Sequence, residues 1–245
     1  MSGSASRSAR ERLREERARQ AKSDKRRRIL ITSVVVVLAL TAVVIGVLVQ
    51  VNRAAPSAFT GGLAPVSVSP DGSVTMAQPG VDKPVLEVYE DFQCPMCKEF
   101  ERVNGGAVKD LAARGKVKIV YHPIAFVNPT GSLRAAAAAQ CVPGGKWMAF
   151  HDAIFTGQPD ERTALTVQDL KDFADQAKID DSSVISCMEN QKYAGLITQN
   201  TAAAFKTPDV QGTPTLILDG RKLDDNDTFT SDGLRSALQS ATTQS

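Results

Sequence analysis

Glu90-Asp91-Phe92-Gln93-Cys94-Pro95-Met96-Cys97 is the stretch of sequence that decides the fold of this chain. Its first residue, Glu90, is the last residue of an apolar run, residues 84–90. This run is rich in β-branched and aromatic side chains and predicts a strand. It leads into a stretch with helical character that extends to about Val103. A Cys-x-x-C unit between a strand and a helix is typical of a redox centre, so the sequence predicts thiol chemistry here.

The positions of the two cysteines account for this chemistry. Pro95 suits the first turn of a helix, where its missing N–H costs nothing, so Cys94 lies at the helix N-terminus. The free N–H groups there stabilise a thiolate on Cys94, and Cys97 lies close enough to form a disulfide with it. We expect Cys94 to exchange with substrates and Cys97 to resolve the mixed disulfide. A zinc half-site and a purely structural disulfide are the alternatives, although the chain offers no second Cys-x-x-C pair for zinc.

The rest of the folded part has an α/β order. Residues 116–124 predict a second strand, and residues 130–206 are almost wholly helical in their pattern. Residues 213–221 predict a strand and a tight Asp-Gly turn, and residues 234–238 predict a short closing helix. Residues 104–106, Asn-Gly-Gly, are expected to break the first helix before it resumes.

The N-terminal residues are expected to set the location of the protein. Residues 29–49 carry no charge and would form a helix about 31 Å long, which matches the hydrocarbon core of a bilayer. We expect an uncleaved transmembrane helix here; the alternative is a cleaved signal peptide, whose apolar region is usually shorter. The basic run that ends at Arg28 places residues 1–28 in the cytoplasm and the chain after Gln50 outside the membrane.

Charge and composition separate this tail from the remainder of the 245 residues. Residues 1–28 hold 11 basic and 4 acidic residues, whereas the other residues hold 18 basic and 23 acidic ones. An acidic body argues against nucleic acid as its partner. Residues 50–70 are rich in small residues, Pro and Gly and predict a flexible linker, which leaves residues 71–245 as one domain.

Two motifs in the right order give the chain a family resemblance. Residues 90–97, with Gly212-Thr213-Pro214-Thr215 downstream, resemble the DsbA-like branch of the thioredoxin superfamily. Within that branch the chain is similar to the membrane-anchored members of actinobacteria. The resemblance implies a thioredoxin fold within residues 71–245, with a helical insertion at about residues 125–210.

The resemblance also implies roles for individual residues and partners. Cys94 and Cys97 would be catalytic. Pro214 would be a cis-proline facing Cys94, and Thr213 would tune the thiolate. The substrates would be exported proteins with free cysteines, and a vitamin K epoxide reductase homologue in the membrane would reoxidise the enzyme. No cofactor or metal is implied, and the sequence shows no glycine-rich phosphate loop.

One position departs from the family pattern. Many DsbA-like proteins have a buried Glu six residues before the first Cys, where this chain has Val88. Alternation along a strand puts Glu90 on the same side as Val88, so Glu90 is our candidate proton acceptor for Cys97. The alternative is that Glu90, like Glu87 and Asp91, is a solvated carboxylate at the end of a strand.

The remaining histidines and cysteines have structural interpretations. His151 belongs to an apolar helical stripe and is expected to be a hydrogen-bonded core histidine rather than a catalytic one. His122 has no obvious partner and is not expected in the site. Cys141 and Cys187, 46 residues apart, are hypothesised to form a structural disulfide, since paired cysteines are usual in exported proteins. The alternative is two buried free thiols.

These observations favour an enzyme outside the cytoplasm that exchanges disulfides. We expect it to donate disulfides to exported proteins through Cys94 and Cys97. A reductase or isomerase on the same scaffold is one alternative, because the intervening Pro-Met does not set the direction of exchange. A non-catalytic, anchored domain that binds client proteins is the other.

Overall fold

The structure is a computed structural model and describes residues 59–242. The predicted cytoplasmic tail (1–28) and transmembrane helix (29–49) lie outside this range. Within residues 59–242, no helix has the length and apolar character needed to cross a membrane.

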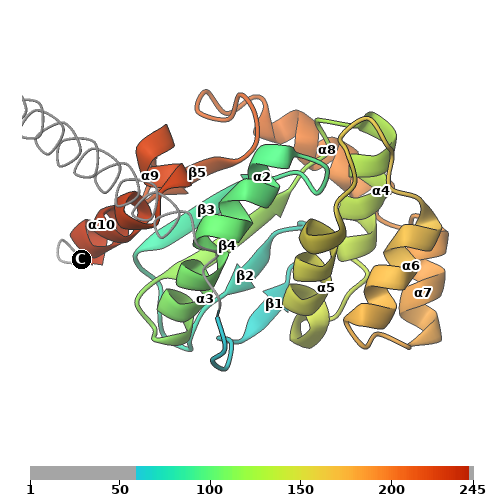
Figure 1. The fold of residues 1–245 in the computed structure, drawn as a ribbon, viewed down its shortest axis with the longest axis horizontal. Coiled ribbons are helices and arrows are strands. Elements are labelled where there is room, and N and C mark those ends of the chain that lie inside the picture. The colour runs from blue at the N-terminus through green and yellow to red at the C-terminus, as the bar shows by residue number, and fades with distance from the viewer. Residues whose placement is uncertain (1–58, 243–245) are drawn as a thin grey trace, which may run out of the picture. The chain divides into compact units, whose positions relative to one another are not determined.

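Among the described residues, six strands form one mixed sheet in the order β1-β2-β4-β3-β5-β6 (Figure 1). The central strands β3 and β4 run parallel, and every other neighbouring pair is antiparallel. The three strands predicted from the sequence are confirmed as β3, β4 and β5. The bounds are β1 (Val66–Val68), β2 (Val74–Met76), β3 (Val85–Glu90), β4 (Lys118–Pro123), β5 (Thr215–Leu218) and β6 (Arg221–Lys222).

The folded part begins earlier than residue 71. Strand β1 lies within the stretch predicted to be a flexible linker, residues 50–70, and its Ser67 pairs with Thr75 of β2. A tight turn between the two strands has Gly72 at φ +88°, a backbone conformation that favours glycine. Three-residue strands are too short to show a period in the sequence, so composition alone suggested a linker.

Strand β3 has two different faces. Leu86, Val88 and Glu90 are buried on one face, whereas Glu87 and Tyr89 are half-buried on the other. Glu90 therefore shares the buried face with Val88, as the alternation along the strand predicted.

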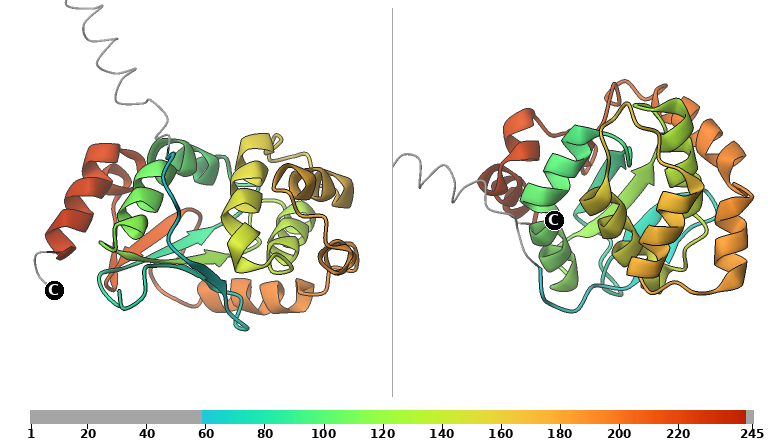
Figure 2. Two further views of the ribbon diagram at one scale, coloured as in Figure 1. Left: turned by 90° about the horizontal axis from the view of Figure 1, so that it is seen from below. Right: turned by 45° about the vertical axis from the view of Figure 1, so that its right-hand side comes forward.

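The helical run that carries the cysteines covers the face of the sheet opposite α8 (Ala194–Ala204) (Figure 2). It passes without a break through α2 (Pro95–Phe100), the π-helical segment η1 (Glu101–Gly105) and α3 (Gly106–Ala113). The predicted break at residues 104–106 is therefore wrong. Asn104 is buried and donates from its amide to the carbonyl oxygen of Thr228 at 2.8 Å, so packing outweighs the low helix propensity of glycine.

Between β4 and β5 lies a run of helices, as the helical pattern predicted. Helix α5 begins against β1, where a Cβ on Gly144 would lie 2.0 Å from the carbonyl oxygen of Val66, so only glycine fits. A disulfide between Cys141 and Cys187 joins the end of α4 to α7. The bounds are α4 (Pro129–Ala139), α5 (Gly144–Gly157), α6 (Val167–Gln176), α7 (Ser182–Glu189) and α8 (Ala194–Ala204).

The C-terminal part closes the sheet. The predicted Asp-Gly turn joins β5 to β6, with Asp219 at φ +47° and Gly220 at φ +82°. Two helices follow, α9 (Asp225–Phe229) and α10 (Ser231–Thr242). Helix α10 extends beyond the predicted helix at residues 234–238, and α9 was not predicted.

Candidate active site

Cys94 and Cys97 lie at the start of α2, just beyond the end of β3. Cys94 is the N-cap residue, with extended backbone angles, and Pro95 occupies the first helical turn as predicted. Both cysteines are free thiols. Cys94 is 5% exposed and Cys97 is fully buried, so the first cysteine is the one that a substrate can reach.

The two thiols have opposite acidities. The pKa of Cys94 is lowered from 9.0 to about 6, chiefly by a hydrogen bond from Cys97 that outweighs the opposing effect of burial. The Thr213 side chain and the backbone N–H groups of Cys97 and Met96 contribute to the same lowering. Burial raises the pKa of Cys97 well above its usual value, and Cys94 and the charge of Glu90 raise it too. At neutral pH the site therefore holds a thiolate on Cys94 beside a protonated Cys97.

The loop before β5 lies against Cys94. The Thr213–Pro214 peptide bond is cis, and Sγ of Cys94 lies 3.1 Å from the carbonyl oxygen of Thr213. A groove of about 430 Å³ runs along this loop and is also lined by Met96, which is 47% exposed, and by Phe229.

Asp91 holds the backbone around the site and does not act as a free base. It is fully buried, and its carboxylate accepts hydrogen bonds from the backbone N–H groups of Gln93, Phe126 and Val127 at 2.7–2.8 Å. The possibility that it is a solvated carboxylate is therefore excluded.

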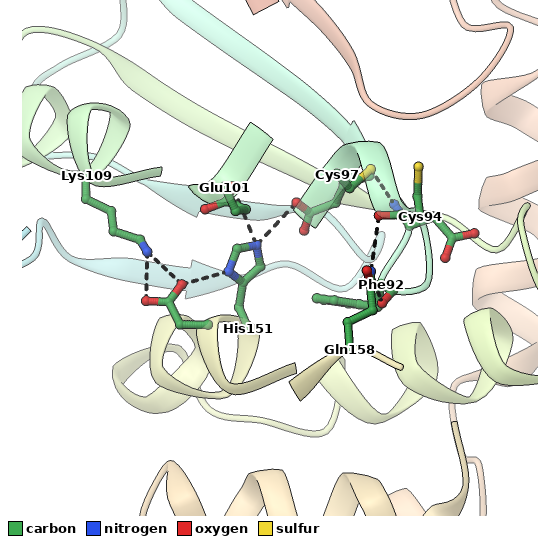
Figure 3. Close-up of polar contacts among 10 residues, drawn as sticks. Phe92, Cys94, Cys97, Glu101, Lys109, His151 and Gln158 are labelled. Carbon is green, nitrogen blue, oxygen red and sulfur yellow. Dashed lines mark hydrogen bonds and ion pairs between the residues drawn. The ribbon is translucent and has the colours of Figure 1, made fainter. Parts of the chain in front are cut away.

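The helical insertion also holds the start of α2. The amide of Gln158, at the end of α5, donates to the carbonyl oxygens of Phe92 (2.8 Å) and Cys94 (3.1 Å) (Figure 3). In return, the ammonium of Lys98 donates to the carbonyl oxygens of Thr156 and Gln158. Sequence reasoning missed Gln158 and Lys98, because contacts across 58 or more residues leave no local pattern.

Glu90 lies in a buried charged cluster. It is 1% exposed, and its Oε2 lies 3.2 Å from Nε2 of His151, which is fully buried. Oε1 of Glu101, from η1, lies 4.0 Å from the same nitrogen. The possibility that Glu90 is a solvated carboxylate is therefore excluded, and His151 is a hydrogen-bonded core histidine as predicted.

The charge of His151 is stabilised from both sides. Burial disfavours the imidazolium, but Glu90, Glu101 and a hydrogen bond to Asp152 raise the pKa of His151 to about 10. Nδ1 of His151 lies 3.1 Å from Asp152, whose carboxylate accepts from the Lys109 ammonium at 2.6 and 2.7 Å (Figure 3). Ligand atoms of Glu90, Glu101 and His151 lie within 4.8 Å of one another, close enough to hold a cation, but the imidazolium already supplies positive charge there.

Comparison with known proteins assigns the chain to a family. The profile of the thioredoxin family matches residues 82–240, more than half of the chain. The chain belongs to the thioredoxin family. Among curated proteins, no sequence matches it.

Solved structures of thioredoxin-family enzymes resemble this one. Disulfide bond oxidoreductase DsbG of Mycobacterium tuberculosis is 30% identical, with a TM-score of 0.56 over 67% of this chain and 82% of that one. DsbA of the same organism is 28% identical, with a TM-score of 0.53 over 73% and 99% of the two chains. BdbD of Bacillus subtilis shares the fold at 21% identity, with a TM-score of 0.62 over 75% and 100%. The comparisons support a thiol–disulfide oxidoreductase of DsbA type.

In this member of the thioredoxin family, the structure brings together most of the site residues that were predicted from the sequence. Cys94, Cys97, Thr213 and Pro214 meet at one end of the sheet, and Glu90 lies buried on the same face. Cys141 and Cys187 are joined to each other in the insertion and take no part in this cluster.

His122 lies on the other face of the sheet and does have a partner. Its Nε2 is 3.1 Å from the Glu87 carboxylate, and its ring stacks on Tyr89 with centroids 4.5 Å apart. Since Glu87 and His122 face away from Cys97, neither belongs to the candidate site.

Proposed function

We propose that this protein is an extracytoplasmic thiol–disulfide oxidoreductase that donates disulfides to exported proteins through Cys94 and Cys97. Residues 29–49 would anchor it in the cell membrane with residues 1–28 in the cytoplasm. The observation that carries the proposal is the contrasting placement of the two thiols. Cys94 caps the N-terminus of α2 and is 5% exposed, which fits its lowered pKa, whereas Cys97 is fully buried, which raises its pKa.

The exchange has two steps in which atoms and electrons balance. In the oxidised enzyme Cys94 and Cys97 share a disulfide, and a substrate thiolate attacks Sγ of Cys94. The substrate–Cys94 bond forms, the Cys94–Cys97 bond breaks, and Cys97 leaves with the electron pair and takes up a proton. A second substrate thiolate then displaces Cys94. The substrate gains a disulfide, and the enzyme ends as a Cys94 thiolate and a Cys97 thiol.

The acidity of Cys94 supports the oxidising direction. A group that stabilises the Cys94 thiolate stabilises the reduced enzyme, so the disulfide becomes a stronger oxidant. The hydrogen bond from Cys97 and the side chain of Thr213 both act in this way. Glu90, on the buried side, is the proposed proton acceptor for Cys97 when the reaction runs towards the enzyme disulfide.

A disulfide donor must be reoxidised after each turnover. We propose that a membrane partner, a homologue of vitamin K epoxide reductase, accepts the electrons of the reduced pair. The anchor would hold Cys94 near the membrane surface where such a partner is found.

The reduction potential of the Cys94–Cys97 pair tests the direction of exchange. Full-length protein is equilibrated in glutathione buffers, alkylated and analysed by peptide mass, so that Cys141 and Cys187 are counted separately. We expect a value towards the roughly −120 mV of DsbA; a value near the roughly −270 mV of thioredoxin would make the protein a reductase.

A Cys94→Ser variant separates an enzyme from a client-binding domain. An oxidoreductase loses turnover with this change, because the attacked sulfur is gone. A binding domain keeps its affinity for clients and its role in the cell, and a wild-type pair that fails to exchange with glutathione would favour it.

A further inference from the structure

Cys97 exchanges a proton in a place that water does not reach. Cys97 and His151 are fully buried and Glu90 is 1% exposed, so neither the thiol nor its proposed acceptor contacts solvent. In each catalytic cycle one proton must nevertheless cross this region, because Cys97 alternates between a thiol and a disulfide sulfur.

The groups around His151 form a continuous polar connection to the surface. Oε2 of Glu90 lies 3.2 Å from Nε2 of His151, and Nδ1 of the same ring lies 3.1 Å from Oδ1 of Asp152. The Asp152 side chain is 46% exposed, so this end meets solvent. The titratable and charged groups that face His151, one from each packed element, are Glu90 (β3), Glu101 (η1), Lys109 (α3), Tyr121 (β4) and Asp152 (α5), with Cys97 (α2) beyond Glu90.

A buried carboxylate needs a cation nearby to remain ionised. His151 is that cation for Glu90. Lys109 pairs with Asp152 at 2.6 Å, on the far side of the imidazole. Oε1 of Glu90 has no hydrogen-bond partner among the described residues, so one oxygen of this carboxylate is available for a proton.

We propose that His151 is a positioning residue that keeps Glu90 ionised, ready to take the proton of Cys97, and releases a proton of its own to Asp152. The inference rests on the proposed function and adds a proton path to it. When Glu90 gains the Cys97 proton it loses its charge, and His151 loses the main reason to stay charged. The Nδ1 proton then passes to Asp152 and on to water, so one proton enters the path and one leaves it.

Resolution of a mixed disulfide isolates this step. Reduced full-length protein is mixed with oxidised glutathione, with a metal chelator in every buffer, then quenched, alkylated and followed by mass. The Cys94 thiolate first attacks glutathione disulfide and releases one glutathione thiolate. Cys97 then loses its proton, attacks Cys94 and releases the second. The first step starts from a thiolate and serves as the internal control.

In a His151→Gln variant we expect the second step to slow by roughly 10- to 100-fold and the first step to change little. The effect should be smaller than the roughly 10²- to 10⁴-fold that a proton-transfer group itself contributes, because Glu90 remains in place. The difference in rate from wild type should narrow at high pH, where Cys97 loses its proton without an acceptor. A role limited to packing would affect stability but would not lengthen the lifetime of the mixed disulfide in this pH-dependent way.

Two further variants keep the test decisive. His122→Gln removes the other histidine, which has a similar carboxylate partner on the opposite face, and should leave both steps unchanged. Asp152→Asn alters the half-exposed end of the path and should slow the second step even if His151→Gln does not fold.

The inference is overturned if His151→Gln and Asp152→Asn both resolve the mixed disulfide at the wild-type rate across the pH range. That outcome leaves the proposed function intact, because exchange still occurs. If the wild-type protein forms no mixed disulfide with glutathione, the proposed function fails and the proton path fails with it.

Discussion

At the scale of single residues, Cys94 and Cys97 carry the same side chain in opposite environments. Cys94 is reachable from solvent and receives hydrogen bonds that favour its thiolate, whereas Cys97 is enclosed beside the charge of Glu90. The acidity of each thiol therefore depends on the other, and a change at one should be measurable at its neighbour.

Replacing Cys97 with Ala should raise the pKa of Cys94 from about 6 towards its usual 9.0, because the Cys97 hydrogen bond is the largest influence that lowers it. The thiolate fraction at pH 7, and with it the rate of alkylation of Cys94, should fall severalfold. The pH dependence of alkylation of the reduced variant measures the shift. An unchanged pKa would mean that the helix N-terminus and Thr213 suffice.

The residues of the site differ in how far the sequence could predict them. Cys94 and Cys97 follow from a local motif, and Glu90 follows from the two-residue alternation of a strand. The role of His151 could not be predicted, because its partner Glu90 lies 61 residues away and only the fold brings the two together. The apolar neighbours of His151 correctly predicted that it lies in the core, but they gave no sign that its ring is charged.

At the scale of elements, the helical insertion fixes the active-site helix. Buried Gly131, near the start of α4, packs against the side chain of Gln93, which accepts from the Leu165 N–H and donates to the Thr163 carbonyl oxygen. A Cβ on Gly131 would lie 1.5 Å from Oε1 of Gln93 and 2.7 Å from the Leu165 nitrogen, so a side chain there must displace the loop.

A Gly131→Ala variant should be destabilised by about 1–3 kcal/mol, the usual cost of overpacking. The matched control is Gly145→Ala in α5, where a new Cβ meets nothing within 4 Å; this exposed helical position should gain up to about 1 kcal/mol. Urea unfolding of the two variants measures the difference in stability. Equal stabilities would contradict the close contact between Gly131 and Gln93.

Helices and strands could be predicted from the sequence where a periodic or capping pattern extended over enough residues. The strand at residues 84–90 and the helix that begins at Pro95 have clear periodicity or capping signals. The break expected at residues 104–106 did not occur, since propensity is a local quantity and the partner of Asn104, Thr228, is 124 residues distant. Strands β1 and β2 were missed because three residues are too few for a period.

At the scale of the whole molecule, two features should change the stability of the fold without taking part in thiol exchange. The Cys141–Cys187 disulfide closes a segment of 46 residues within the insertion. The buried carboxyl group of Glu101 belongs to η1, which continues directly from α2, and neither of its oxygens has a hydrogen-bond partner among the described residues. The first feature should stabilise the fold and the second should destabilise it at neutral pH.

A Cys141→Ala/Cys187→Ala double variant should lose about 2–4 kcal/mol of unfolding free energy, because loss of the cross-link increases the conformational freedom of the unfolded chain. The Cys94–Cys97 reduction potential should be unchanged, since the bond lies outside the candidate site. Denaturant unfolding and a glutathione titration measure the two quantities. A shifted potential would show that the insertion transmits strain to the redox pair.

A Glu101→Gln variant should be more stable than wild type at pH 7 by about 1–2 kcal/mol. Burial raises the pKa of Glu101 from 4.5 to about 6, so the folded protein binds this proton more tightly than the unfolded chain does. The corresponding stability is present below pH 4.5 and is lost as the pH rises through 6. At pH 4 the variant and the wild type should therefore be equally stable. A gain in stability at both pH 4 and pH 7 would show that the ionisation of Glu101 is not its cause.

The two edges of the sheet bear on how the proposed enzyme would hold a client protein. At one edge α5 lies so close to β1 that only Gly144 fits, and at the other β6 is two residues long and consists of Arg221 and Lys222. An extended polypeptide adds readily to a long, open sheet edge, and both edges here discourage that pairing. If the protein donates disulfides as proposed, a client would be held by one sulfur–sulfur bond and by the groove of about 430 Å³ beside residues 213–214, and once that bond is exchanged little else would delay its departure.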